Sequence, residues 1–418
     1  MKTGIKLPAS ALGYAISFML LTGLICSGLL FIAGTHKRIE KIHNQRENLC
    51  FDNRFALNYG ASYELPLHDQ MIHPSGDTSQ IYSCEWGAYR IIHVETQHPM
   101  GRRYTTALSG KEHQKDLPSL YLVDHQQALK IGGNTRIEGV AAFSERGIER
   151  AYIAGKNYAN EKLLFGTQTR SHTYLPALKK SIATLSFNQL PEEHQVQNWT
   201  AHDSTYSFRN QCTVLSQTGS ITIRQNLRGN VIIRSFDSIF VAAEARLEHV
   251  RLIAPVICFE KGFSGTVQAS ASRKIICETE VLLKYPSALC LLPAEGNGET
   301  GAKSEIRLAE KCQVLGGILI RQSLTRIRNL PYLYMAPESL VAGLIYNTGE
   351  TEMHGESAGH LFTNYFTLSA GGGQYTNHLL DARIGATQLP EEFILPEWLE
   401  TQHEQKSKII AWFGSSAK

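Results

Sequence analysis

The chain has 418 residues, of which 43% are hydrophobic and 19% charged, a composition typical of folded proteins and not of disordered or collagen-like chains. Its net charge of +3 comes from 41 basic and 38 acidic residues, with no dense basic run, so we expect no nucleic-acid partner. Serine-hydrolase, metalloprotease and dinucleotide-binding motifs are absent from the sequence. We therefore expect no enzymatic activity, no catalytic residue, no cofactor and no metal site.

Residues 7–35 carry no charged side chain and are rich in Leu, Ile, Phe, Ala and Gly. This pattern predicts a transmembrane helix, because about 20 apolar residues cross a bilayer core of about 30 Å. A cleaved signal peptide is the alternative, but its apolar region spans only about 7 to 15 residues, and residues 33–35 make a poor cleavage site. We expect residues 1–35 to form a short tail and an anchor, with residues 7–33 in the lipid bilayer.

The charges beside this span give two opposing indications of orientation. Lys37, Arg38, Lys41 and Arg46 follow it closely, and an excess of basic residues on that side favours a cytoplasmic body. Against this, a short tail before a long C-terminal domain is typical of an uncleaved signal anchor, and long domains translocate despite their charge. We favour export of the body.

The rest of the chain divides into segments with different patterns of apolar, polar and turn residues. Residues 36–49 predict a charged stalk that continues the helix, and residues 50–116 alternate apolar and polar types, which predicts strands and loops. Residues 117–396 contain short β-branched strands that recur about every eight to ten residues and are separated by glycines. Hairpin dipeptides are few, so a parallel β-solenoid, or β-helix, is favoured over a sandwich or a barrel.

Three segments interrupt or end this pattern. Residues 156–218 predict an insertion, with a short helix near 191–199 that carries the glycosylation sequon starting at Asn198. Residues 294–302 are rich in glycine and predict an exposed loop. Residues 397–418 predict a helix that caps one end of the solenoid. The predicted fold is mainly β, with a parallel solenoid body, one N-terminal transmembrane helix and a C-terminal capping helix.

Eight cysteines are present, and only Cys26 lies in the span, which leaves an odd number outside it. Cys50 and Cys84 flank one region and can bridge in an oxidising compartment; whether they pair is left open. The other cysteines of the predicted solenoid show no C-x-x-C spacing and are interpreted as small buried residues and not as a zinc site. In particular, we expect Cys258 and Cys277 to occupy equivalent interior positions on adjacent coils. The cysteines interpreted in this way are Cys258, Cys277, Cys290 and Cys312.

The strongest polar pattern is Glu350, Glu352, His354 and Glu356, whose period of two places all four on one face of a strand. Such a face can bind a divalent cation or supply an acid and a base. However, alternate residues of a coil point to water whenever their neighbours point inward, and we favour this interpretation.

A second, weaker pattern pairs His378 with Asp381 close to Gly371–Gly373, where the glycines favour a tight turn. Solenoid enzymes that act on polysaccharides use carboxylates, alone or with basic residues, on an outer face. Nothing in the sequence selects a catalytic set from the exposed charges of the middle coils. Those charges are Asp237, Glu244, Arg246, Glu248 and Arg251.

Several phrases resemble an uncharacterised family of single-pass bacterial envelope proteins. They are Leu120-Tyr-Leu-Val-Asp124, Gly133-Asn-Thr-Arg-Ile-Glu-Gly139, Gly147-Ile-Glu-Arg-Ala-Tyr-Ile-Ala-Gly155, Gly343-Leu-Ile-Tyr346, His354-Gly355, Thr363-Asn-Tyr-Phe366 and Tyr375-Thr-Asn-His-Leu-Leu380. The resemblance implies an N-terminal anchor, a β-helical body and an association with pseudopilin-like components, and it transfers no catalytic residue. A looser similarity to polymer-forming bactofilins rests only on the short strands separated by glycine.

The function that we expect is a membrane-anchored, non-enzymatic envelope scaffold or interaction protein, accessory to a pilus-like or secretion assembly. The expected location is the bacterial inner membrane, with the large C-terminal domain in the periplasm. Envelope protein partners are expected without being identified, and self-association is left open. Two alternatives are a polysaccharide-active β-helix enzyme and a cytoplasmic, bactofilin-like polymer.

Overall fold

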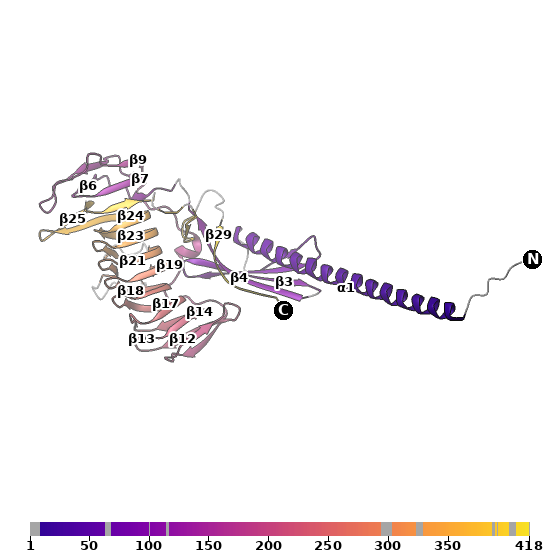
Figure 1. The fold of residues 1–418 in the computed structure, drawn as a ribbon. Coiled ribbons are helices and arrows are strands. Elements are labelled where there is room, and N and C mark those ends of the chain that lie inside the picture. Colours follow the sequence, from indigo (N-terminus) through magenta and orange to yellow (C-terminus); the bar gives the residue numbers. More distant parts are fainter. Residues whose placement is uncertain are drawn as a thin grey trace, which may run out of the picture.

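The computed structural model consists of a long N-terminal helix, an antiparallel sheet against its C-terminal end, and a tall stack of parallel strands (Figure 1). The prediction of a mainly β protein with one long apolar N-terminal helix is confirmed. The glycine-rich loop expected at 294–302 lies outside the described residues. The structure describes residues 9–62, 68–99, 101–113, 117–293, 303–322, 329–386, 389–390, 392–400 and 407–417.

Helix α1 (Ala9–Ser62) has 54 residues and at 1.5 Å per residue is about 80 Å long. Its N-terminal part projects away from both sheets (Figure 1), and the helix is long and apolar enough to cross a membrane. The helix contains the expected stalk, but it also continues through residues 50–62, where strands were predicted. The reason is the helical spacing of its buried residues Leu49, Asn53, Ala56 and Leu57, which face the antiparallel sheet.

The antiparallel sheet confirms the strands predicted between residues 68 and 112. It contains β1 (His68–Ile72), β2 (Thr78–Trp86), β3 (Tyr89–His98) and β4 (Gly101–Glu112) in that order. Its contact with α1 contains an apolar cluster that includes Leu57, Ile92 and Ala107. The C-terminal end of the helix is also fixed by a hydrogen bond, in which Arg90 Nη2 donates to the carbonyl oxygen of Ala61 at 3.0 Å.

The predicted C-terminal helix is wrong. Residues 407–417 form strand β29 (Ser407–Ala417), which pairs with β4 together with the short strand β28 (Ile394–Leu395). Without these strands the outer edge of β4 would expose a row of unpaired backbone groups, so the chain end completes the sheet instead of coiling. Glu397 and Trp398 precede it in non-helical backbone, and residues 401–406 lie outside the described residues.

The remaining strands stack on one another in parallel, except for the antiparallel hairpin of β24 and β25. Phe240, Cys258 and Ile276, for example, lie opposite one another on three successive strands, each 18 residues after the last. Apolar side chains from all levels form one continuous interior. The strands are β5 (Leu120–Leu122), β6 (Leu129–Gly132), β7 (Arg136–Phe143), β8 (Ile148–Arg150), β9 (Phe165–Arg170), β10 (His194–Asn198), β11 (Ser204–Tyr206), β12 (Cys212–Gln217), β13 (Ile221–Ile223), β14 (Asn226–Gly229), β15 (Val231–Ser235), β16 (Ser238–Val241), β17 (Arg246–Phe259), β18 (Ser264–Cys277), β19 (Leu282–Leu291), β20 (Glu305–Leu308), β21 (Gln313–Ile320), β22 (Tyr332–Met335), β23 (Leu340–Met353), β24 (Glu356–Ala370), β25 (Gly373–Thr376), β26 (His378–Leu380) and β27 (Arg383–Gly385).

The order of the strands along the stack differs from their order in the sequence. Strand β5 pairs with β24 and β7 pairs with β27, so the first strands of the stack lie beside the last ones. The pairing order begins at β10 and ends at β9, so the two ends of the stack belong to strands that are neighbours in sequence. Residues 171–193, which join β9 to β10, therefore run along the stack, and we call them the connector.

The connector lies within residues 156–218, where an insertion was predicted. Tyr346 Oη donates a hydrogen bond to the carbonyl oxygen of Pro176 at 2.9 Å, and Arg251 Nη2 donates to that of Gln189 at 3.4 Å. Levels far apart in the stack therefore bind the same connector. The helix of the connector is α2 (Lys180–Ala183). The helix predicted near 191–199 is wrong, because residues 194–198 form strand β10.

The parallel register corrects the prediction for two cysteines. Cys277 lies opposite Phe259 and is fully buried, whereas Cys258 lies opposite Ile276 and is only half-buried. A difference of one residue in a strand moves a side chain to the other face, and the spacing of 19 residues exceeds the register of the coils by one. All eight cysteines are free thiols, including Cys50 and Cys84.

Candidate functional site

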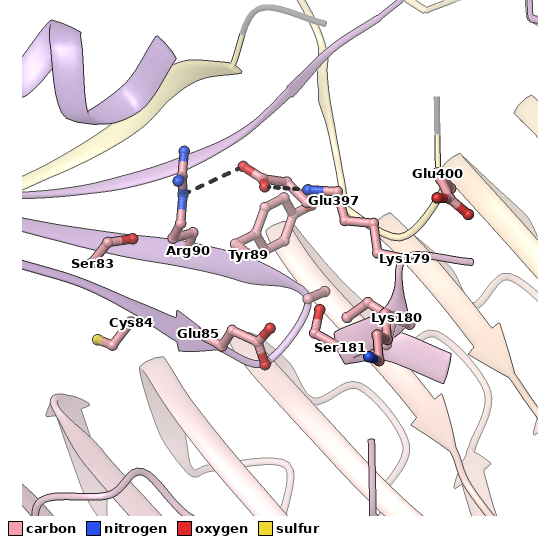
Figure 2. A pocket seen from close by; sticks show the side chains of 13 residues that line it. Ser83, Cys84, Glu85, Tyr89, Arg90, Lys179, Lys180, Ser181, Glu397 and Glu400 are labelled. Carbon is pink, nitrogen blue, oxygen red and sulfur yellow. Dashed lines mark hydrogen bonds and ion pairs between the residues drawn. The ribbon is translucent and has the colours of Figure 1, made fainter. Parts of the chain in front are cut away.

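A cavity of about 700 Å³ lies where the turn between β2 and β3 meets the connector and the segment after β28 (Figure 2). It therefore lies at the junction between the antiparallel sheet, which holds α1, and the parallel stack. The cavity is the main candidate site among the described residues. Its lining consists of Ser83, Cys84, Glu85, Gly87, Ala88, Tyr89, Arg90, Lys179, Lys180, Ser181, Ile182, Glu397 and Glu400.

One buried carboxylate, that of Glu397, lies beside two basic side chains of the cavity. Glu397 Oε2 lies 3.1 Å from Lys179 Nζ, and its Oε1 lies 3.9 Å from Arg90 Nε (Figure 2). The backbone supports the same junction, because the amide of Lys179 donates to the carbonyl oxygen of Trp398 at 2.8 Å. Removing one member of a buried ion pair commonly costs about 3 to 5 kcal/mol. The charges of this site therefore hold the sheet, the connector and the C-terminal segment together.

The cavity holds three side chains that can act as nucleophiles after activation, Ser83, Cys84 and Ser181. Burial raises the pKa of Cys84 to about 11, and the positive charge of Arg251 only partly opposes this shift. The thiol is therefore protonated at neutral pH, and the described lining includes no histidine that could act as a base. This geometry is better suited to binding and positioning than to covalent chemistry.

The predicted cluster on residues 350–356 does not form one solvated face. Glu350 pairs with Lys303, and Glu356 begins the next strand, opposite Leu340. Glu352 is buried, with only 4% of its surface exposed. The prediction that alternate residues point to water therefore fails for Glu352, because the hairpin of β24 and β25 supplies the neighbouring Ser369, which covers it.

The Glu352 carboxylate is held by three side chains. Tyr332 Oη and Ser369 Oγ donate to its Oε2, the latter at 2.9 Å, and His354 Nε2 lies 3.2 Å from its Oε1. Burial alone would raise the pKa of Glu352, but these hydrogen bonds outweigh it and lower the pKa to about 2. The residue is a charged structural tie between neighbouring coils.

The second predicted pair is separated. Asp381 accepts hydrogen bonds from Lys156 Nζ at 2.6 Å and from the amide of Asn134 at 2.9 Å. These bonds outweigh burial and lower the pKa of Asp381, to which the charge of His354 also contributes. His378 instead makes its contact with the carbonyl oxygen of Thr376, at 2.7 Å. The first and second patterns thus meet through His354 and not through His378.

The glycines beside this pair have the predicted role. Gly371 and Gly372 have φ values of 58° and 80° and form the turn of the hairpin between β24 and β25. L-residues with a side chain rarely adopt this backbone conformation, so the turn requires glycine.

The charges of the middle coils do not gather into a catalytic set. Glu244 and Glu248 form exposed ion pairs with Arg224 and Arg228. Arg251 is buried, 5.3 Å from the ring centre of Trp86. Within the described part of the chain, no group of three or more His, Cys, Asp and Glu side chains is arranged to hold a metal ion.

Sequence reasoning missed the cavity because its charged residues are far apart in the chain. Arg90, Lys179 and Glu397 belong to three segments, and no local spacing connects them. The one signal was the composition of residues 397–400, where two acidic residues flank two large apolar ones.

No protein-family model matches the chain, and no curated protein matches it. Among solved structures, the competence-associated pilin ComZ from Thermus thermophilus aligns with 91% of this chain and 96% of its own, at 8% identity and a TM-score of 0.21. A TM-score this low supports no conclusion about fold or function. The functional argument therefore rests on the geometry of this chain.

Proposed function

We propose that the protein is a membrane-anchored, non-enzymatic scaffold of the bacterial envelope, with its body in the periplasm. The observation that carries the proposal is the unpacked half of α1. None of its most apolar window is buried, and Leu12, Phe18 and Phe31 expose 67%, 68% and 73% of their surface. Burying one such side chain stabilises a protein by about 1.5 to 3 kcal/mol, so a lipid bilayer is the environment that fits this helix.

The helix also sets a distance between bilayer and body. The uncharged stretch ends at Thr35, and packing against the sheet begins at Leu49. The 13 residues between them extend about 20 Å as a helix. Lys37 and Arg38 lie where the span leaves the hydrocarbon, a position in which basic side chains reach the lipid headgroups. The sheet and the stack would stand clear of the membrane surface.

We further propose that the parallel stack is a β-solenoid. The 18-residue step of its register and its continuous apolar interior support this classification. A body of this kind is rigid and presents long, regular outer faces. These properties suit a scaffold or interaction surface, and we infer a role as an accessory of a pilus-like or secretion assembly.

Membrane extraction tests the anchor directly. In the variant with Leu21→Arg and Leu24→Arg, each arginine adds about 2.5 to 3.5 kcal/mol to the cost of insertion at the helix centre. We expect the wild-type chain to stay with membranes at alkaline pH and the double variant to become soluble. The matched control, Leu21→Phe with Leu24→Phe, should behave as the wild type. A wild-type chain that alkaline buffer releases from membranes would overturn the anchor.

The non-enzymatic role requires its own test. The chain is incubated with a panel of uronate and peptidoglycan polymers, and the products are separated by chromatography. We expect no turnover. Turnover that Glu352→Gln or Asp381→Asn abolishes would replace the scaffold by a polysaccharide-active enzyme, and filaments formed by the chain under the electron microscope would support the cytoplasmic polymer.

A further inference from the structure

One outer face of the stack carries a row of apolar side chains. Phe240, Cys258 and Ile276 lie opposite one another on three successive levels. Val256 points to the same side, because it precedes Cys258 by two residues in β17. Phe240 exposes 39% of its surface, and the other three side chains are half-buried. We call these four residues the apolar strip.

The apolar strip faces away from the interior of the stack. The residues that alternate with it, Ile239, Ile257 and Ile275, are fully buried in that interior. The antiparallel sheet and the connector instead bind Gln268 and Arg251, which lie earlier in β18 and β17. The exposure of the apolar strip therefore leaves it open to a partner outside this chain.

We propose that the apolar strip joins two copies of this chain in a symmetric dimer. The proposal rests on the membrane anchor proposed above. Moving apolar side chains out of water into such a contact is favourable, and Phe240 contributes most because it is the most exposed of the four. Dimers of identical chains pair the same surface of both copies about a two-fold axis. When two faces pack on each other, this axis lies in the plane of contact.

The anchor restricts the direction of the axis. Helix α1 runs across the stack and not along it (Figure 1). A two-fold rotation about an axis along the stack would reverse every direction across it, and the two anchors would then point in opposite directions. Both helices can enter one membrane only if the axis itself runs across the stack. In that arrangement the levels of the second copy follow one another in the opposite order.

Exposed charges beside the apolar strip fit this arrangement. Asp237 immediately precedes β16, and Arg273 holds the equivalent place two levels further on, in β18. Both are exposed. Hydrogen bonds from Ser220 and Ser238 lower the pKa of Asp237, so it is negatively charged at neutral pH. With the axis at the level of Cys258, each Asp237 would face Arg273 of the second copy, which gives two contacts between opposite charges.

The same axis matches the apolar residues. Phe240 would pack on Ile276 of the second copy, once on each side of the axis, and Cys258 and Val256 would lie beside their own equivalents. One like-charge contact opposes the dimer, because the exposed Glu260 lies on the level of the axis and would approach its equivalent. This arrangement predicts that neutralising Glu260 tightens the dimer.

The face is large enough for a weak dimer. It covers the five levels of β13, β16, β17, β18 and β20, and at about 4.8 Å per level it is about 24 Å tall. Its strand and corner residues extend about 20 Å, at about 3.3 Å each. Two such faces would bury about 1,000 Å² in total, the size of weak specific interfaces. Confinement to one membrane raises the effective concentration of the second copy, so a weak contact suffices.

The first experiment measures the dissociation constant of the full chain in detergent by sedimentation velocity. We expect Phe240→Asp and Ile276→Asp each to raise this constant at least about tenfold, because each change acts twice in the interface. Tyr152→Asp is the matched control, since Tyr152 is 70% exposed and lies outside the apolar strip. It should leave the dissociation constant unchanged.

The charge contact has a test by rescue. Arg273→Asp places two carboxylates opposite each other on both sides of the axis and should weaken the dimer roughly tenfold. Adding Asp237→Arg to this variant should restore the dissociation constant of the wild type. Glu260→Gln should lower the constant. Thermal unfolding of each variant verifies that it is folded.

The second experiment tests the direction of the axis in isolated membranes. Two copies with different tags are produced together, one with Phe240→Cys and the other with Ile276→Cys, and are oxidised with copper phenanthroline in air. We expect disulfides between unlike copies and at least about fivefold fewer between like copies, because a disulfide forms only over a short distance. The remaining cysteines are buried once the other accessible thiols are removed. The substitutions that remove them are Cys26→Ser, Cys50→Ser, Cys84→Ser and Cys258→Ala.

The outcomes separate the dimer from the anchor. A chain that is monomeric in detergent and forms no crosslink in membranes, or one whose association Phe240→Asp leaves unchanged, would overturn the dimer. Crosslinks mainly between like copies would overturn the proposed axis. Neither result affects the anchor, which alkaline extraction tests by itself. A chain that alkaline buffer releases from membranes but that dimerises through Phe240 and Ile276 would support the interface and contradict the anchor.

Discussion

Asn53 gives the sharpest test of how the helix is held on the sheet. Its side chain is 1% exposed, and its Nδ2 donates to Thr96 Oγ1 at 3.0 Å and to the carbonyl oxygen of Arg103 at 3.2 Å. Its Oδ1 accepts from Thr105 Oγ1 at 2.5 Å. One amide of α1 thus satisfies polar groups on both β3 and β4. In the variant Asn53→Ala these groups lose their partner without gaining access to water.

The magnitude follows from these three hydrogen bonds. A buried polar group left without its partner costs about 1 to 3 kcal/mol, and Thr96 keeps a second contact with Ser79 Oγ at 2.7 Å. We therefore expect a loss of about 3 kcal/mol in the free energy of opening the helix from the sheet, which is roughly a 100-fold change in the opening equilibrium.

Hydrogen exchange with mass spectrometry measures this opening. The amides of residues 54–62 and 91–94 should exchange roughly 100-fold faster in Asn53→Ala than in the wild type, while the stack is unchanged. Asn58→Ala is the control, because Asn58 is exposed on the same helix. A change of less than about threefold in Asn53→Ala, or an equal change in both variants, would refute the assigned role of these hydrogen bonds.

Three further variants test buried titratable residues. The hydrogen bonds to Glu352 lower its pKa to about 2. The charged carboxylate therefore stabilises the fold fully above the unfolded pKa of about 4.3, and this stabilisation is lost as the pH falls towards 2. In thermal unfolding, the stability of Glu352→Gln should fall less over this pH range than that of the wild type. Burial lowers the pKa of His360 to about 4, so the stability of the wild type should fall as the pH decreases from 6.5 towards 4. The variant His360→Gln should remove part of this pH dependence. The control His43→Gln, on the exposed stalk, should leave it unchanged. Glu397→Ala removes the buried carboxylate that lies beside the half-buried Lys179 and the buried Arg90, and it should cost about 3 to 5 kcal/mol in denaturant unfolding. Glu244→Ala, in an exposed ion pair, should give no measurable change. A pH-independent difference for the first two variants, or equal losses for the last two, would contradict these assignments.

The features that the sequence predicts correctly depend on local periodicity. The uncharged run at 7–35 and the alternating strands of residues 68–112 carry their own signal, so the helix and the sheet strands were predictable. The same reasoning failed at residues 50–62, because Asp52 and Asn53 look like turn residues although both are buried against the sheet. A buried polar residue that is satisfied by distant partners cannot be distinguished in sequence from an exposed one.

Long-range pairing was beyond the reach of the sequence. Parallel strands carry no sequence mark of their partner, so the pairing of β5 with β24 and the path of the connector had no local signal. Strand β29 was wrongly predicted as a helix because the edge of β4, with which it pairs, exists only in the folded sheet. The cavity follows the same rule, because Glu397 meets Lys179 only in the finished fold.

The central claim is an anchored protein with an exported body, and Cys50 allows the most direct test. This exposed thiol lies on α1 beyond the uncharged stretch, where packing against the sheet begins. Intact spheroplasts are treated with a membrane-impermeant maleimide, and labelling is compared between the wild type and Cys50→Ser, which separates the signal of Cys50 from that of other thiols. The account predicts labelling of Cys50 without lysis. Labelling that appears only after the membrane is broken would place the body in the cytoplasm and contradict the account.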